Sequence, residues 1–243
     1  MKILSTRRLF TLLTLTLSAS APAFAATAAM KPFHAEYTTL QNDNELGRTT
    51  LDLADNHDGS WTLRSETIGT AGLAKIAGIH IVETSRFRWQ DGRPLALAYD
   101  YKQDGGFKQR TRHAEFDWKT NQVRVTEGGD FTYASVPGLI DRQAVTLALA
   151  ADLLRGASSF DYKVAVKDHV EDMRYTRGAS ETLKVPAGTF KTLVMQREGE
   201  PGADRKRVAR SWFAESLGWM PVQIEQTEKK GDTVTLKLVS SNR

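Results

Sequence analysis

Residues 185–238 decide the fold. They open with the turn sequence VPAGTF at 185–190, which leads into the alternating run KTLVM at 191–195. Three further strand-like runs follow, WFAE at 212–215, LGWMPVQI at 217–224 and TVTLKLV at 233–239. Pro186 presets φ for the first corner of the turn, and Gly188 tolerates a positive φ. Because short alternating runs between turns are typical of antiparallel strands, we expect a meander here.

The same alternation extends through the region that precedes this meander. Strand-like runs occupy residues 33–41, 46–54, 61–68, 79–89, 95–101, 107–118, 123–126 and 131–133. Asp91-Gly92 and Gly128-Gly129 are typical turn sequences between such strands. Several runs are longer than the common strand of about six residues, which favours a strongly curved sheet or a barrel. The chain is therefore predicted to be mainly β.

One segment interrupts the strand pattern with a helical one. Asp141 can cap a helix over residues 143–155, and Gly156 can end it. Val145 and Leu149 belong to an apolar surface that covers most of the helix, and such helices are normally buried. We predict a single curved antiparallel sheet, or an open β-barrel, wrapped around this one apolar helix.

Residues 1–25 have the features of an export signal. Basic residues precede the apolar run 9–17, and Ala23-Phe24-Ala25 matches the pattern of a cleavage site. We expect cleavage near Ala25, which leaves residues 26–243 as a single β-rich periplasmic domain. The pair Arg7-Arg8 also resembles a twin-arginine signal, so the general and the twin-arginine export routes both remain open.

The net charge gives no reason to expect a nucleic acid partner. The sequence has 33 Lys and Arg against 29 Asp and Glu, a formal charge of +4. Residues 1–25 contain three basic and no acidic residues, so the remainder carries +1. There is no cysteine, so no lipid-attachment residue follows the signal. The apolar run 9–17 is too short to cross a bilayer, and no second long apolar run follows it. We therefore expect a soluble exported protein that is not membrane-spanning and binds no nucleic acid.

Several stretches carry a family resemblance. They are FDYKV at 160–164, ETLKVPAGTFKTLVM at 181–195, RSWF at 210–213, MPVQI at 220–224 and VTLKL at 234–238, with LIDRQ at 139–143 before the helix. In these stretches the chain resembles the bacterial domain of unknown function 3108. The resemblance implies an exported, mainly antiparallel β protein without an established activity. A curved sheet around a helix is also similar in architecture to periplasmic lipoprotein-carrier folds, which handle acyl chains.

The sequence shows no catalytic or metal-binding constellation. The histidines are His34, His57, His80, His113 and His169, and they form neither an HExxH motif nor a close pair. No GxSxG motif occurs, and acidic residues are too numerous for any one pair of them to be diagnostic. We therefore expect no cofactor, no metal ion and a non-enzymatic role.

Residues 69–78, GTAGLAKIAG, allow two interpretations. They can form a buried crossover that covers one end of the barrel. They can also form a lip at the mouth of a ligand cavity, or a tip that touches a membrane. In the second interpretation the candidate lip residues are Ile68, Leu73, Ile76 and Ile79.

Large side chains elsewhere are candidates for the lining of a cavity. These are Trp61, Trp89, Val145, Leu149, Trp212 and Trp219. Aromatic side chains fill the interior of curved sheets or line apolar cavities, so simple core packing is the alternative. The basic runs 108–113 and 205–210 are either solvated strand faces or a surface for an anionic envelope polymer or lipid headgroup.

Together these features favour a periplasmic protein that binds or carries an apolar or amphipathic cell-envelope component, such as a lipid. The cavity would lie near residues 69–79. The alternative is an envelope assembly or protein-interaction factor that binds envelope proteins and no small ligand. A large apolar cavity by residues 69–79 would support the first hypothesis, and a filled interior would contradict it.

Overall fold

The computed structural model describes residues 30–106, 109–199, 208–227 and 231–243. The strands are β1 (Phe33–Gln41), β2 (Asn44–Asp55), β3 (Trp61–Gly69), β4 (His80–Gln90), β5 (Arg93–Asp104), β6 (Arg110–Asp117), β7 (Gln122–Thr126), β8 (Asp130–Ala134), β9 (Ile140–Asp141), β10 (Phe160–Ala165), β11 (Val170–Val185), β12 (Gly188–Arg197), β13 (Val208–Ala214), β14 (Met220–Thr227) and β15 (Thr233–Ser241). The helices are α1 (Gly72–Ile76), α2 (Ala144–Leu154) and the 3₁₀ helix η1 (Glu215–Leu217). The expected export signal lies outside the described residues.

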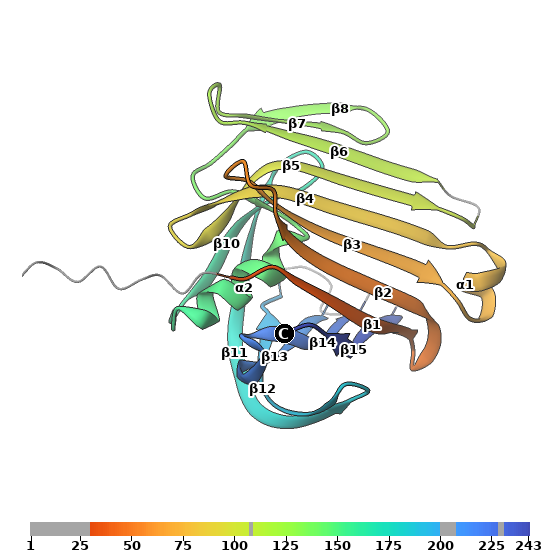
Figure 1. Cartoon of the computed structure of the whole chain (residues 1–243). Coiled ribbons are helices and arrows are strands. Elements are labelled where there is room, and N and C mark those ends of the chain that lie inside the picture. The colour runs from red at the N-terminus through yellow and green to blue at the C-terminus, as the bar shows by residue number, and fades with distance from the viewer. Residues whose placement is uncertain (1–29, 107–108, 200–207, 228–230) are drawn as a thin grey trace, which may run out of the picture.

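The strands form one sheet in the order β8-β7-β6-β5-β4-β3-β2-β1-β15-β14-β13-β12-β11-β10-β9. Neighbouring strands are antiparallel except β9 and β10, which are parallel. Strand β1 pairs with β2 on one side and with β15 on the other, so the first and last strands meet in the middle of the sheet. We call β1–β8 the first wing and β9–β15 the second wing. Figure 1 shows the sheet bent so that the two wings face each other.

Helix α2 lies inside the curve, toward the end of the sheet opposite α1 (Figure 1). Its buried residues are Ala144, Val145, Leu147, Ala148, Leu149, Ala150, Ala151, Asp152 and Leu153. Ahead of the helix, the Ala96 N–H in β5 donates to the Leu139 carbonyl at 3.2 Å, so the start of the second wing touches the first. The sequence-based prediction of an open, curved antiparallel sheet around one apolar helix is confirmed.

Helix α2 begins and ends where Asp141 and Gly156 in the sequence indicate. The Ala144 N–H donates to Asp141 Oδ1 at 3.0 Å, which satisfies one of the free amides of the first turn. At the other end, Gly156 has φ of 71° and its N–H donates to the Leu153 carbonyl at 3.0 Å. This left-handed conformation is easily reached by glycine, so the helix stops here.

Helix α2 also carries a fully buried carboxylate. Asp152 is 0% exposed, and it accepts hydrogen bonds from Arg93 Nε at 3.0 Å and from the Tyr162 hydroxyl at 2.8 Å. Arg155 donates to the same group. A buried charge costs several kcal/mol unless it is paired and hydrogen-bonded. Since Arg93 lies in β5 and Tyr162 in β10, Asp152 ties the helix to both wings.

The meander predicted at residues 185–238 is present as β12–β15, with antiparallel pairing throughout. Gly188, at the end of its first turn, has φ of 139°. The strand before that turn, β11, is 16 residues long. A register shift between Arg177 and Ser180 divides it.

Residues 69–78 do not form the buried crossover. They contain α1, none of whose residues is buried. The Thr70 and Ala71 N–H groups donate to the Leu46 carbonyl at 3.0 and 3.1 Å, and the Gly106 N–H donates to the Ala77 carbonyl at 2.7 Å. The turn thus projects from the end of the sheet but is held by backbone hydrogen bonds to its neighbours.

We expect the substitution Asp152→Ala to lower the free energy of unfolding by about 3–5 kcal/mol, because it leaves the Arg93 guanidinium partly buried without its partner. Thr146→Ala on the same helix is the matched control, and should change stability by less than about 1 kcal/mol. Urea denaturation followed by tryptophan fluorescence measures both. Equal effects of the two substitutions would show that Asp152 does not tie the helix to the wings.

Candidate ligand cavity

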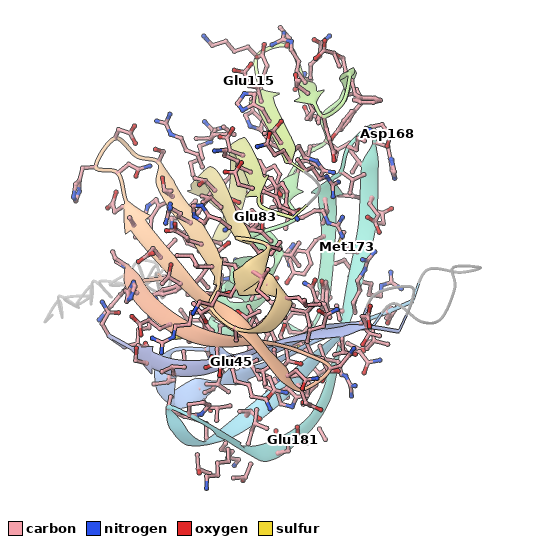
Figure 2. The ribbon with its side chains drawn as sticks, turned by 90° about the vertical axis from the view of Figure 1, so that its right-hand side faces the viewer. Glu45, Glu83, Glu115, Asp168, Met173 and Glu181 are labelled. Atoms are coloured by element: carbon pink, nitrogen blue, oxygen red, sulfur yellow. The ribbon has the colours of Figure 1, made fainter. Side chains whose placement is uncertain are left out.

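A cavity of about 530 Å³ lies between the wings. Its lining comes from β1–β6, α1, α2, β14 and β15, so it reaches from α2 to the end of the sheet that carries α1. Leu63, Ser65 and Thr67 line it as alternate residues of β3, as expected for one face of a strand. Figure 2 views the molecule from the α1 side, with Glu83 inside the curve of the sheet. The volume is within the range of ~300–1,000 Å³ that is common for small-ligand sites.

The part of the lining that comes from the helix and the last strands is mostly apolar. Leu147 and Ala150 of α2, Ile224 of β14 and Leu236 of β15 all contribute to it. An alkyl chain that leaves water for such a surface gains about 0.8 kcal/mol per buried methylene group. We call this surface the apolar side of the cavity.

A row of hydroxyl groups crosses the first three strands of the lining. Thr39 Oγ1 and Thr49 Oγ1 are 2.7 Å apart, and Thr49 Oγ1 and Thr67 Oγ1 are also 2.7 Å apart. These hydroxyls satisfy one another across β1, β2 and β3. This part of the lining therefore does not need a ligand to complete its hydrogen bonds.

Strands β4 and β5 contribute a carboxyl group and a phenol. The Tyr99 hydroxyl donates to Glu83 Oε1 at 2.5 Å. Burial raises the pKa of Glu83, although the bond from Tyr99 opposes the shift. Nearby, burial raises the pKa of Asp141 to about 6, and the Glu83 carboxylate adds to the shift by repulsion. The two carboxyl groups thus disfavour each other's ionisation.

The hydroxyl group of Ser85 lies between two acceptor oxygens, one of Asp141 and one of Gln143. Ser85 Oγ lies 2.6 Å from Asp141 Oδ1 and 2.8 Å from Gln143 Oε1. A hydroxyl has one hydrogen and can donate to only one of these acceptors at a time. A proton on Asp141 therefore completes the network. Gln143 Nε2 in turn donates to the backbone carbonyl of Glu83 at 3.1 Å, which ties the start of α2 to β4.

Three arginines line the cavity on the same side as Glu83, and we call Arg110, Arg112 and Arg142 the arginine cluster. Arg110 Nε and Arg112 Nε each donate to Glu127 at 2.6 Å, one to each carboxylate oxygen. Burial opposes the ionisation of Glu127, but these hydrogen bonds outweigh it and lower the pKa of Glu127. Glu127 is therefore an ionised carboxylate that two guanidinium groups hold.

The third member of the cluster is placed differently. Arg142 is exposed and precedes the first turn of α2. Its positive charge and that of Arg112 both act to lower the pKa of Glu83. In the described part of the chain, Arg142 forms no ion pair and no hydrogen bond. We call the surface formed by Glu83, Tyr99 and the arginine cluster the polar side of the cavity.

The four candidate lip residues separate into two pairs. Ile68 and Ile79 line the cavity, together with Ala74 of α1. Leu73 and Ile76 do not line it, and are 81% and 83% exposed. The pairs differ because α1 turns Ala74 inward and its two larger apolar side chains outward.

None of the six residues expected to line the cavity does so. Val145 and Leu149 belong to the packed core, as Leu147 and Ala150 do, but of these four only Leu147 and Ala150 also line the cavity. Trp61 and Trp89 pack against each other edge to face, with ring centroids 6.1 Å apart, beside the same core. These four side chains fill space that the cavity does not reach.

The remaining two tryptophans belong to the second wing. Trp212 is buried, and its indole N–H donates to Glu181. Trp219 borders a separate surface hollow of about 390 Å³, with Phe213 and Glu215. The expectation that tryptophans line the ligand cavity is corrected by these positions.

The sequence pattern did not place any residue of the polar side in the cavity. For the run that contains Arg110 and Arg112, the sequence left open a solvated strand face or a surface for an anionic polymer or lipid headgroup, and the Arg112 side chain is only 12% exposed. Glu83 follows Ile79 and Ile81 in alternation, which places it on the inner face of β4, but a carboxyl among apolar residues is not diagnostic by itself. Residues 205–207 of the second basic run lie outside the described residues.

Two other features bear on function. Within the described residues, no three His, Cys, Asp or Glu side chains are grouped as metal ligands. None of the helices in that part of the chain has the length and hydropathy to cross a membrane.

The pH dependence of stability should report the burial of Asp141. The pKa of Asp141 is about 6 in the folded chain against the usual 3.8. The neutral carboxyl group therefore contributes stability that is fully present below pH ~4 and is lost as the pH rises through about 6. Asp141→Asn keeps an acceptor oxygen but cannot ionise. We expect the variant to gain roughly 2–3 kcal/mol on the wild type between about pH 4 and pH 8, by urea denaturation. A difference that stays constant with pH would mean that Asp141 ionises normally.

Comparison with known proteins supports the fold and the family. No curated protein sequence matches the chain. Among solved structures, it is similar to a beta-barrel-like protein of domain of unknown function DUF1849 from Brucella abortus, with a TM-score of 0.56 and 8% identity over 88% of this chain and 98% of that one. At this identity the likeness shows the fold alone. The family described as Protein of unknown function (DUF3108) matches residues 34–239. The chain therefore belongs to the DUF3108 family, as its sequence resemblance indicated.

Proposed function

We propose that the chain is a non-enzymatic protein of the bacterial periplasm that binds or carries an apolar or amphipathic component of the cell envelope. The observation that carries this proposal is the cavity of about 530 Å³, which has an apolar side and a polar side. The signal-like residues 1–25 support export. An amphipathic cavity matches a ligand that has an alkyl chain and a polar end.

The polar groups around the cavity support a binding role more than a catalytic one. Ser85 is 0% exposed and is held by Asp141 and Gln143, so a substrate cannot reach its hydroxyl. Glu127 is held by two arginines. A nucleophile or general base needs access to the reacting atom, and these two groups do not have it.

A series of neutral amphiphiles tests the proposal directly. Octanoyl-, decanoyl- and dodecanoylglycerol should bind with affinity that rises about fourfold per added methylene group, since each contributes about 0.8 kcal/mol when buried. Isothermal titration calorimetry on the full chain measures this. An affinity that does not depend on chain length would contradict an apolar cavity as the binding site.

Two tryptophan substitutions on adjacent residues of β4 give the matched control. Ile81 lines the cavity, whereas Val82 is its neighbour on the opposite face of the strand and does not. Ile81→Trp should weaken the binding of dodecanoylglycerol by about tenfold or more, because the indole occupies the space of the chain. Val82→Trp should leave it unchanged. Equal effects would place the ligand elsewhere.

The second candidate function is that of an envelope assembly or protein-interaction factor without a small ligand. The exposed side chains of Leu73 and Ile76 favour it, because large apolar groups on a projecting turn are suited to contact with another surface. If no acylglycerol binds, this second function becomes the better account.

A further inference from the structure

The polar side of the cavity carries an excess of positive charge. Three guanidinium groups of the arginine cluster stand against one ionised carboxylate, that of Glu127. Glu83 and Asp141 are the other acids here, and burial raises the pKa of both. Asp141 does not line the cavity, so among the described residues that do, four arginines, the cluster and Arg243, stand beside one acidic side chain, that of Glu83. The surface therefore attracts anions.

Arg142 is the member of the arginine cluster that is free to bind an anion. Arg110 and Arg112 direct their guanidinium groups to Glu127, whereas Arg142 forms no ion pair or hydrogen bond within the described residues. It is exposed and it lines the cavity. A guanidinium group with free N–H donors can bind a carboxylate or a phosphate through two parallel hydrogen bonds.

The position of Arg142 joins this charge to the apolar side. It lies two residues before Ala144, where α2 begins, and the same helix presents Leu147 and Ala150 to the cavity. A ligand whose polar end touches Arg142 can thus lay an alkyl chain along α2. The cavity volume of about 530 Å³ is in the lower half of the usual range of ~300–1,000 Å³, which suits one chain better than the several chains of a complex lipid.

We infer that the ligand is a single-chain amphiphile with an acidic headgroup, either a carboxylate or a phosphate monoester, and that Arg142 binds this headgroup. The inference rests on the proposed function and specifies its ligand class. The alkyl chain lies against the apolar side, and the headgroup accepts hydrogen bonds that Arg142 donates to no side chain of the described residues.

Probes with one chain length and different headgroups test the inference. Dodecanoate should bind the full chain about tenfold more tightly than dodecanoylglycerol, as expected for a charge-assisted hydrogen-bonded pair, and dodecyltrimethylammonium should bind most weakly. Dodecyl phosphate is included because its affinity relative to dodecanoate distinguishes the two acidic headgroups. Calorimetry below the micellar concentration measures all four.

Substitutions of Arg142 separate its role from general packing. Arg142→Gln should reduce the affinity for dodecanoate about tenfold, to that of dodecanoylglycerol, and leave the neutral probe unchanged. Arg142→Lys should retain part of the preference for the acid. Arg48→Gln is the matched control, since Arg48 is an exposed β2 residue outside the cavity lining and its loss removes the same charge.

The outcomes distinguish this inference from the function on which it rests. If dodecanoylglycerol binds as tightly as dodecanoate, or if Arg142→Gln weakens both alike, the headgroup assignment is wrong while the ligand-binding function stands. If none of the probes binds, the function itself is wrong and the assignment is wrong with it. An effect of Arg48→Gln as large as that of Arg142→Gln would also overturn the assignment.

Discussion

Strands β1 and β15, from opposite ends of the chain, pair along the middle of the sheet, from Ala35 opposite Ser241 to Gln41 opposite Val234. Without this pairing the chain would form two separate meanders, because the remaining antiparallel ladders join strands that are adjacent in sequence. With it, the two wings become one surface that bends around its own middle. The cavity lies in that bend and takes its lining from both wings. Such a long-range pairing is entropically costly, and helix α2 supplies contacts that offset the cost.

Helix α2 keeps the wings apart as well as holding them together. Asp152 binds Arg93 of the first wing and Tyr162 of the second, while Leu149 and its neighbours fill the core at that end. The helix does not extend to the α1 end, so the interior there is left open as a cavity. Buried groups with raised pKa values, Glu83 and Asp141, lie beside this opening. Natural proteins often accept such a loss of stability where they bind ligands.

The sequence predicted the parts of this structure that depend on local rules. Alternation and turn residues indicated the strands, and a long apolar segment between Asp141 and Gly156 indicated the buried helix. Which face of each element lines the cavity depends on tertiary packing. A helix that is apolar all round offers no distinction between Leu149, which only packs in the core, and Leu147, which packs in the core and also lines the cavity. Likewise, alternation in β6 shows that Arg110 and Arg112 share a face, but not that the face is concave.

The central claim is that an amphiphile occupies the interior between the wings, and the location of a bound ligand tests it most directly. Dodecanoylglycerol with a photoreactive diazirine on its chain can be cross-linked to the protein, and the modified residues identified by peptide mass spectrometry. We predict cross-links to Leu63, Ile81 and Ile224, which line the cavity from three different strands. Cross-links confined to the exposed Leu73 and Ile76, or spread over the outer faces of the sheet, would contradict the account.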